Sequence, residues 1–460
     1  MITSLFRTKH VDAFKTRDTG LKRCLRAFDL TLLGIGAIIG AGIFILTGIA
    51  AATRAGPAIV LSYVLAGLAC SFTALAYAEL SSSIGGSGSA YGYAYASMGE
   101  FIAWIIGWTL ILEYGVAVSA VAIGWSAYVN SLIVANGIHM PHSLITSPFS
   151  GGIIDLPAVL IVIVLTALLS IGVHESTRVN NFIVYIKFIA IAVFVGIAMF
   201  HIKPANWHPF APFGWSGAVK GAALIFFAYI GFDAVSTAAD EAIEPQKTLP
   251  IGILSSLAIC TLIYVVCSGL LTGIQPYSTL NNAAPVAHAL ISIGYNFGAS
   301  VVSVGAIAGL STVCLVMFYG LTRIMFAMSS DGLLPPVFSR VHPKTKTPVR
   351  VIVVCGILIA LIAGFTPIEQ VAEIVNIGTL AAFVVVSAGV LVLRYTKPEL
   401  PRPFKVPFSP IVPLLGMGFC LYLMLNLPSV TWIRFTIWMV IGLVIYFVYG
   451  RKHSLLLTKS

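Results

Sequence analysis

The amino-acid sequence predicts an all-α membrane protein with twelve membrane-spanning helices. Of its 460 residues, 58% are hydrophobic and only 9% are charged, far from the balance of a soluble domain. Apolar stretches of about 20 residues, the length of a helix that crosses a bilayer, recur along the chain between short polar loops. We place the spans at roughly 28–53, 57–81, 99–130, 153–172, 178–200, 216–240, 250–272, 286–328, 350–365, 371–393, 410–426 and 432–450.

The basic residues predict the orientation of these spans. With both termini in the cytosol, 21 of the 26 Lys and Arg residues lie on the cytosolic side, which is the positive-inside pattern. The net charge of +10 therefore reflects membrane topology and not a nucleic acid partner. The Gly-rich polar segment 81–89 between the second and third spans is expected to turn on the cytosolic side.

Several functional classes find no support in the sequence. The seven cysteines form no C-x-x-C pair, and the nine histidines show no metal-ligand spacing. A nucleophile turn of the G-x-S-x-G type and a phosphate-binding G-x-x-x-x-G-K-[ST] loop are both missing. We therefore expect no metal, no cofactor, no enzyme and no ATP-driven pump. A nutrient sensor built on a transporter fold remains an alternative, although such sensors usually add a long cytosolic extension.

Two spans are interrupted in ways that ordinary membrane helices are not. The first carries four glycines within nine residues, from Gly34 to Gly42, and each interior glycine costs about 1 kcal/mol relative to alanine. The sixth carries Gly231 and Asp233 near its middle. Interrupted helices in matching positions of two repeats point to a transporter's binding site. The alternative is that the glycines only allow close helix contact.

Four segments resemble the amino acid–polyamine–organocation transporters, above all the bacterial members of their cationic amino acid transporter branch. They are residues 34–44, 226–234, 244–250 and 331–335, with Glu244 standing where many relatives carry Asn. The resemblance implies a five-plus-five inverted-repeat (LeuT-like) fold with two further C-terminal helices. The repeats would be 28–200 and 216–394, followed by helices within 410–450, with cytosolic tails 1–27 and 451–460. It also implies a bacterial plasma membrane protein that transports amino acids, coupled to protons or by exchange.

The chemistry of an amino acid matches the two interruptions. Free amides at the start of the second half of helix one, from Ala41 and Gly42, suit a carboxylate. Carbonyls that end the preceding half-helices, from Ile38, Phe227 and Ile230, suit an ammonium. The resemblance implies substrate contacts in these same segments, Ala228 included.

Side-chain selection must come from the walls of the site. The candidates are apolar or aromatic, and each of them could instead simply fill the core: Ile43, Phe226, Phe227, Tyr229, Met317 and Leu321. These walls hold no acid, so we expect small or branched neutral substrates, although Glu113 could reach the site if helix three leans in. Exchange and cationic substrates stay open as alternatives, as does the oligomeric state, with a monomer as one possibility.

Five ionisable groups lie within spans. Glu79 and Asp240 are close to cytosolic helix ends and are expected to be solvated. Lys187 lies about nine residues into the fifth span, roughly 13 Å from its end, where a lysine is costly. One interpretation is that Lys187 forms a structural ion pair with Glu113 or Asp233. The other is that it carries a proton, with those two neighbours setting when it is protonated. The resemblance favours the carrier, because some proton-coupled members place a helix-five lysine where related folds hold a cation between helices one and eight.

Overall fold

The computed structural model describes residues 5–9, 24–84, 89–135, 137–172, 177–239, 241–282, 284–345 and 347–458. Over these residues the chain is helical, with isolated β-bridges but no β-strand. The helices are α2 (Ala27–Ile38), α3 (Thr47–Ala50), α4 (Ile59–Ile84), α5 (Ser89–Ser97), α6 (Glu100–Ala135), α7 (Leu156–Ser170), α8 (Thr177–Ala198), α9 (Gly214–Ile225), α10 (Ala234–Thr237), α11 (Pro245–Ile274), α12 (Pro285–Ser292), α13 (Asn296–Ser330), α14 (Val349–Phe365), α15 (Ile368–Thr396), α16 (Ile411–Leu425), α17 (Ser429–Ile445), α18 (Arg451–His453) and α19 (Leu455–Thr458).

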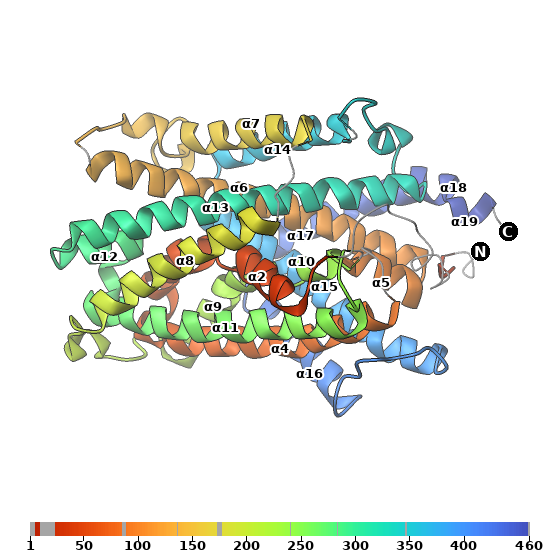
Figure 1. Ribbon diagram of the computed structural model, residues 1–460, viewed down its shortest axis with the longest axis horizontal. Helices are drawn as coiled ribbons and strands as arrows, with labels where there is room; N and C mark the ends of the chain where they lie inside the picture. The colour runs from red at the N-terminus through yellow and green to blue at the C-terminus, as the bar shows by residue number, and fades with distance from the viewer. Residues whose placement is uncertain are drawn as a thin grey trace.

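Many of these helices can cross a membrane. In the described part of the chain, eight helical segments are long and apolar enough to do so, and four shorter apolar helices accompany them. The long helices run roughly along one axis of the molecule (Figure 1). The prediction of an all-α, multi-pass membrane protein is therefore confirmed.

The two predicted interruptions are present. Helix α2 ends at Ile38, Ile39 is extended, and a π-helical turn over Gly42–Leu46 resumes the helix. Helix α9 passes into a 3₁₀ turn over Phe226–Tyr229 and then stops, because Ile230 is extended. Gly231 follows with φ +121°, a conformation that glycine adopts far more readily than other residues. A Cβ on Gly231 would lie 2.8 Å from the carbonyl oxygen of Ala37, so the two interruptions touch.

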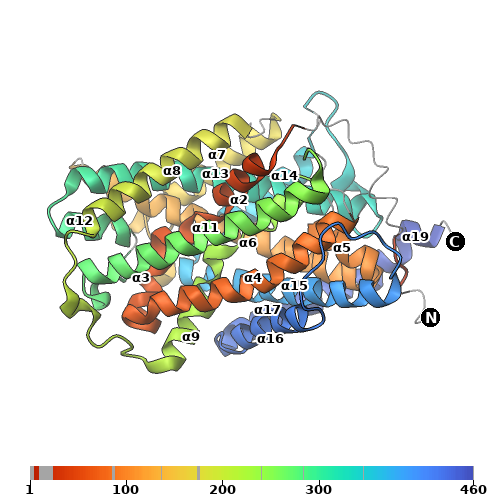
Figure 2. The ribbon, with the colours of Figure 1, turned by 60° about the horizontal axis from the view of Figure 1, so that its bottom comes forward.

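The interruptions lie between two groups of helices. In one group, α6 packs against α7, α13 and α14, and α7 also packs against α14; in the other, α11 packs against α2 and α4, and α4 against α9. Figures 1 and 2 show α2 near the middle of the molecule, with α7 and α14 on one side of it and α4 and α16 on the other in Figure 1. Helix α8 bridges the groups because it packs against both α2 and α13. Helices of both groups therefore surround the two interruptions, where we look for the substrate-binding site.

The two ends of the chain meet at one end of the bundle, which we call the terminal end. Arg7 donates to the carbonyl of Leu456, and Lys9 forms an ion pair of 2.8 Å with Asp331, the residue after α13. At the opposite end, Arg54 pairs with Glu369 and Glu373 of α15, at 3.0 and 3.4 Å.

Three sequence-based expectations need correction. The segment predicted to turn at 81–89 is helical up to Ile84, with Gly85–Gly88 outside the described residues, and a separate helix α5 begins at Ser89. The span predicted at 286–328 is two helices, α12 and α13, because Gly294 takes a φ of +87° between them.

The third correction concerns Glu79, which is only 2% exposed and not solvated. Its carboxylate receives hydrogen bonds from Arg394 and from the backbone N–H of Val406, the latter at 2.7 Å, and Arg402 lies 3.6 Å away. Arginines far along the sequence cover it, which its place in α4 could not reveal. Asp240, the other residue expected to be solvated, lies outside the described residues.

Candidate substrate-binding site

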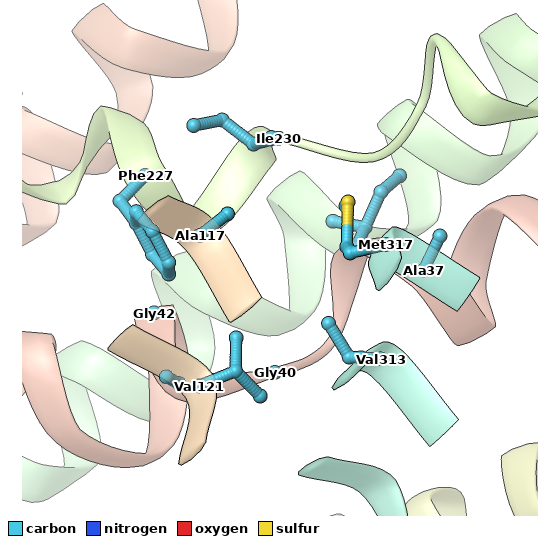
Figure 3. Close-up of a pocket in the computed structure, with 11 residues that line it drawn as sticks. Ala37, Gly40, Gly42, Ala117, Val121, Phe227, Ile230, Val313 and Met317 are labelled. Atoms are coloured by element: carbon cyan, nitrogen blue, oxygen red, sulfur yellow. The ribbon is translucent and has the colours of Figure 1, made fainter. Parts of the chain in front are cut away.

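The two interruptions enclose a hollow that α6 and α13 complete. Its lining residues are Ala37, Ile38, Gly40, Ala41, Gly42, Ala117, Val121, Phe227, Ile230, Val313 and Met317. All eleven are buried, and none has a polar side chain. Figure 3 shows Phe227 and Met317 on opposite sides of the hollow. Its volume of about 10 Å³ admits about one water molecule, so a larger ligand requires these side chains to move apart.

Six of the nine substrate-binding residues proposed from the sequence line this hollow. They are Ile38, Ala41, Gly42, Phe227, Ile230 and Met317. The other three, Ile43, Phe226 and Ala228, are buried but lie outside the lining.

The structure adds five lining residues that the sequence analysis did not name. Ala117 and Val121 are four apart on α6, and Val313 is four residues before Met317 on α13. Residues at this spacing share a helix face, so the prediction of Met317 could have led to Val313. Ala37 and Gly40 complete the lining from the first interruption.

Two backbone amides in the lining of the hollow suit the carboxylate of a ligand. Helix one, the first span, consists of α2 and the helical segment that resumes after the interruption. Ala41 and Gly42 begin this second half, and the first amides of a helix have no partner within it. The close approach of the two interruptions makes glycine necessary here. A Cβ on Gly42 would lie 2.2 Å from the Cα of Ala228, whereas one on Gly40 would meet only Val313, at 3.4 Å.

A tyrosine that the sequence analysis missed joins the two interruptions. The hydroxyl of Tyr264, from α11, lies 2.9 Å from the carbonyl oxygens of both Ile38 and Ala228. Each carbonyl oxygen has two lone pairs, so Ile38 can still accept a ligand hydrogen bond. Because α11 also carries Ser255, Ser256, Thr261, Ser268 and Thr272, the sequence offered no signal that singled out Tyr264.

The predicted wall residues Tyr229 and Leu321 also lie outside the hollow. Tyr229 packs behind it with Tyr63 and Tyr264, the ring centroids lying 5.2–6.2 Å apart. Its hydroxyl donates to the carbonyl of Tyr63 at 2.8 Å. These rings support the interruptions from the side away from α6 and α13.

Lys187 holds the end of the first half-helix. Its side chain is fully buried, and its ammonium donates to the carbonyls of Gly36 and Ile39, at 2.6 and 2.9 Å. The lysine passes close to Gly309 of α13, where a Cβ would lie 2.5 Å from its Cε. The ammonium is therefore fixed between helix one and α13, beside the substrate hollow.

Glu113 and Asp233 form a separate pair of acids. Asp233 accepts a hydrogen bond of 2.9 Å from Tyr114, the neighbour of Glu113, and one of 3.3 Å from the amide of Gly231. The carboxylate of Glu113 is buried, and neither oxygen has a hydrogen-bond partner among the described residues. The nearby hydroxyl of Thr379 donates to its own helix instead, to Val375. Lys187 thus donates hydrogen bonds to two backbone carbonyls, and neither oxygen of Glu113 accepts one.

In the part of the chain that the structure describes, no three His, Cys, Asp or Glu side chains lie close enough together to bind a metal ion.

Comparisons with known proteins identify the family of the chain. A model of the amino acid permease family matches residues 25–449. The chain is 50% identical to the methylthioribose transporter of Bacillus subtilis (strain 168), over 99% of this chain and all of that protein. It is also 50% identical to the branched-chain amino acid permease BcaP of the same organism, over 98% of both chains. The cationic amino acid transporter 4 of Mus musculus is 37% identical, over 84% of this chain and 62% of that protein.

Proposed function

Because the chain belongs to the amino acid permease family, we propose that it takes up small or branched neutral L-amino acids by alternating access, driven by protons. Like its named relatives, the chain is a transporter and not an enzyme. It is a multi-pass protein of a bacterial membrane. We further propose twelve spans in a five-plus-five inverted repeat, 28–200 and 216–394, with two helices in 410–450. The tails 1–27 and 451–460, and with them the terminal end of the bundle, are then cytosolic.

The observation that carries the substrate proposal is the chemistry of the hollow. Its polar groups are backbone amides and carbonyls at two helix interruptions, which match the carboxylate and ammonium that every amino acid shares. Its side chains are all apolar or absent, so they favour an apolar substrate side chain. A lysine or arginine substrate would bury a charge without an acidic partner in the lining, which is costly.

Methylthioribose is the competing substrate, given the similarity to a methylthioribose transporter. A ribose carries several hydroxyl groups that need hydrogen-bond partners, and no lining side chain supplies one. It also lacks the carboxylate and ammonium for which the interruptions provide partners. The geometry therefore favours the amino acid.

A competition assay tests this choice. Purified protein in sealed vesicles takes up labelled isoleucine in the presence of excess unlabelled isoleucine, valine, alanine, arginine, lysine or methylthioribose. We expect valine and unlabelled isoleucine to compete best. Arginine, lysine or methylthioribose competing better than every neutral amino acid would contradict the proposal.

The coupling proposal rests on Lys187. A protonated amine makes charge-assisted hydrogen bonds, which are about twice as strong as neutral ones, so its two bonds to Gly36 and Ile39 hold helix one closed. Loss of the proton weakens this hold. Asp233 follows the second interruption, and Glu113 of α6 is a second buried acid whose carboxylate has no hydrogen-bond partner among the described residues. We propose that these acids take part in proton exchange with Lys187 during the transport cycle.

Lys187→Ala tests the coupling directly. We expect the variant to bind substrate, because the backbone groups of the hollow remain, but not to accumulate it when a pH gradient is imposed. Accumulation with an unchanged pH dependence would make the lysine purely structural. Uptake that disappears when potassium replaces sodium at fixed pH would refute proton coupling itself.

A further inference from the structure

A second hollow lies on the outside of the bundle, away from the substrate site. It has a volume of about 80 Å³ and lies between α7, α13, α14 and the loop that joins α13 to α14. Helix α13 contributes residues at positions 319, 322, 323 and 326, a spacing that places them on one helix face. Leu169 closes the hollow from α7 and Ile352 from α14. We call this hollow the α13 groove.

The α13 groove contains a cation inside an apolar span. Arg323 lies seven residues before the last residue of α13, Ser330, which corresponds to roughly 10 Å along the helix. Its guanidinium lies 4.7 Å from the centre of the Tyr319 ring and donates to the Tyr319 hydroxyl. Tyr319 is one turn farther from the terminal end. The arginine therefore points back into the span and does not extend toward the terminal end, as a long basic side chain near a helix end usually does.

The guanidinium has capacity left for an anion. It carries five N–H donors, of which the contact with Tyr319 engages only part. Among the described residues no carboxylate forms an ion pair with Arg323. Arg323 is exposed, so a molecule outside the protein can reach it.

Basic residues outnumber acidic ones in the loop that joins α13 to α14. The loop carries Arg340 and Lys344, close in sequence to the lining residues Val341 and Thr347. The only acid from 331 to 350 is Asp331, which is paired with Lys9. An anion is thus attracted to the groove, whereas a zwitterionic group would place its ammonium among cations.

The two helices that close the groove, α7 and α14, carry exposed apolar side chains farther into the span. Leu160 and Val164 of α7 are 51% and 50% exposed, and Leu358 and Leu361 of α14 are 56% and 51% exposed. In a membrane these helix faces contact acyl chains. A ligand with an anionic group in the α13 groove and apolar chains that extend along α7 and α14 would meet both surfaces, a combination that an anionic lipid supplies and a soluble anion does not.

We propose that the α13 groove binds the phosphate headgroup of an anionic phospholipid from the leaflet at the terminal end. Arg323 donates two parallel N–H hydrogen bonds to the phosphate, a geometry that arginine provides and lysine does not. The acyl chains lie along the exposed faces of α7 and α14. Basic pockets between membrane helices at the cytosolic side are known to hold such headgroups, and this groove has the same features in this chain.

Native mass spectrometry of the purified full-length protein tests the proposal. The delipidated protein is titrated with phosphatidylglycerol and, separately, with phosphatidylethanolamine. We expect wild type to bind phosphatidylglycerol preferentially, and Arg323→Gln to bind it at least about fivefold more weakly. That factor corresponds to about 1 kcal/mol, the contribution of one basic residue near an anionic membrane surface. Phosphatidylethanolamine binding should not change.

Arg350→Gln is the matched control, because it removes the same charge from an exposed arginine outside the lining. It should bind phosphatidylglycerol like wild type. Equal losses in both variants would mean diffuse surface attraction, and no loss in Arg323→Gln would remove the site; either result overturns the proposal. So would glycerophosphoglycerol, the headgroup without chains, if it displaced the lipid at equal concentration, because the ligand would then be a soluble anion.

Arg323→Lys keeps the test decisive if Arg323→Gln does not fold. Lysine retains the charge but not the paired donors. We expect weaker phosphatidylglycerol binding with the preference over phosphatidylethanolamine kept. Equal binding of the two lipids by wild type and Arg323→Lys would overturn the proposal.

Discussion

The position of Lys187 can be perturbed without touching the lysine itself. Gly309 of α13 faces its side chain, and a Cβ at this position would lie 2.5 Å from the Cε, 3.1 Å from the Cγ and 3.2 Å from the Cδ of Lys187. Carbon atoms in contact normally lie about 3.5–4.0 Å apart. Gly309→Ala therefore forces the lysine stem to move by roughly 1 Å or to change its rotamer.

The expected size of the effect follows from the contacts at the end of the stem. The ammonium makes two short hydrogen bonds, to Gly36 and Ile39, and a hydrogen bond to a charged group contributes about 1.5–3 kcal/mol. Losing one of them shifts the equilibrium of helix one between its closed and released positions by about 10- to 150-fold. We expect Gly309→Ala to accumulate less substrate at a given pH gradient and to show a displaced pH dependence of uptake, with substrate binding kept.

The assay is uptake into sealed vesicles over a series of imposed pH gradients. Gly196→Ala is the control, because it makes the same change on α8, the helix of Lys187, where a Cβ has no neighbour within 4 Å. Combining Gly309→Ala with Lys187→Ala isolates the mechanism, since a change that acts through the lysine has no further effect once the lysine is gone. Uptake by Gly309→Ala that matches Gly196→Ala at every pH would refute the reasoning.

Three further predictions concern single side chains. Gly42→Ala should bind isoleucine at least tenfold more weakly than Gly40→Ala in an equilibrium binding assay. The reason is that a Cβ at residue 42 would lie 2.2 Å from the backbone of Ala228, whereas one at residue 40 would lie 3.4 Å from the side chain of Val313. Equal affinities would argue against the contact of the two interruptions. Tyr264→Phe removes the hydroxyl between two carbonyls, so binding should weaken by about 0.5–1.5 kcal/mol, and unchanged affinity would show that the bridge does not position the site. Glu79→Gln leaves Arg394 without its negatively charged partner, and thermal unfolding should reveal a loss of up to about 3–5 kcal/mol; a melting temperature equal to wild type would mean that the ion pair contributes nothing.

The sequence was sufficient to predict the helix interruptions because their cause is local. Glycines between 34 and 42, and Gly231 beside Asp233, disfavour a continuous helix wherever the rest of the fold lies. The same holds for the apolar spans, since crossing a bilayer depends on the composition of each segment alone. Six of nine proposed substrate residues line the hollow because they belong to the interrupted segments themselves.

Features that depend on distant partners were not predictable in this way. Glu79 is covered by Arg394 and Arg402, more than 300 positions along the chain, and position in the span suggested solvent instead. Tyr264 reaches the interruptions from α11, and no local pattern says which helix packs there. Phe226 and Ala228 lie outside the hollow, because the 3₁₀ turn over Phe226–Tyr229 changes the direction of successive side chains from that of an α-helix.

The geometry also gives a physical reason why substrate and proton could act on one another. Two successive carbonyls at the end of the first half-helix are held from different helices: Ile38 by the Tyr264 hydroxyl from α11, and Ile39 by the Lys187 ammonium from α8. Ile38 also lines the substrate hollow. If Lys187 carries the coupling proton, its loss weakens the hold on Ile39, and the adjoining peptide of Ile38 must respond because the two share one backbone segment. A ligand that binds Ile38 in turn favours one position of Ile39, and the coupling between two sites is reciprocal by thermodynamic necessity. Substrate should therefore alter the pH dependence of the lysine by the same free energy by which protonation alters substrate affinity.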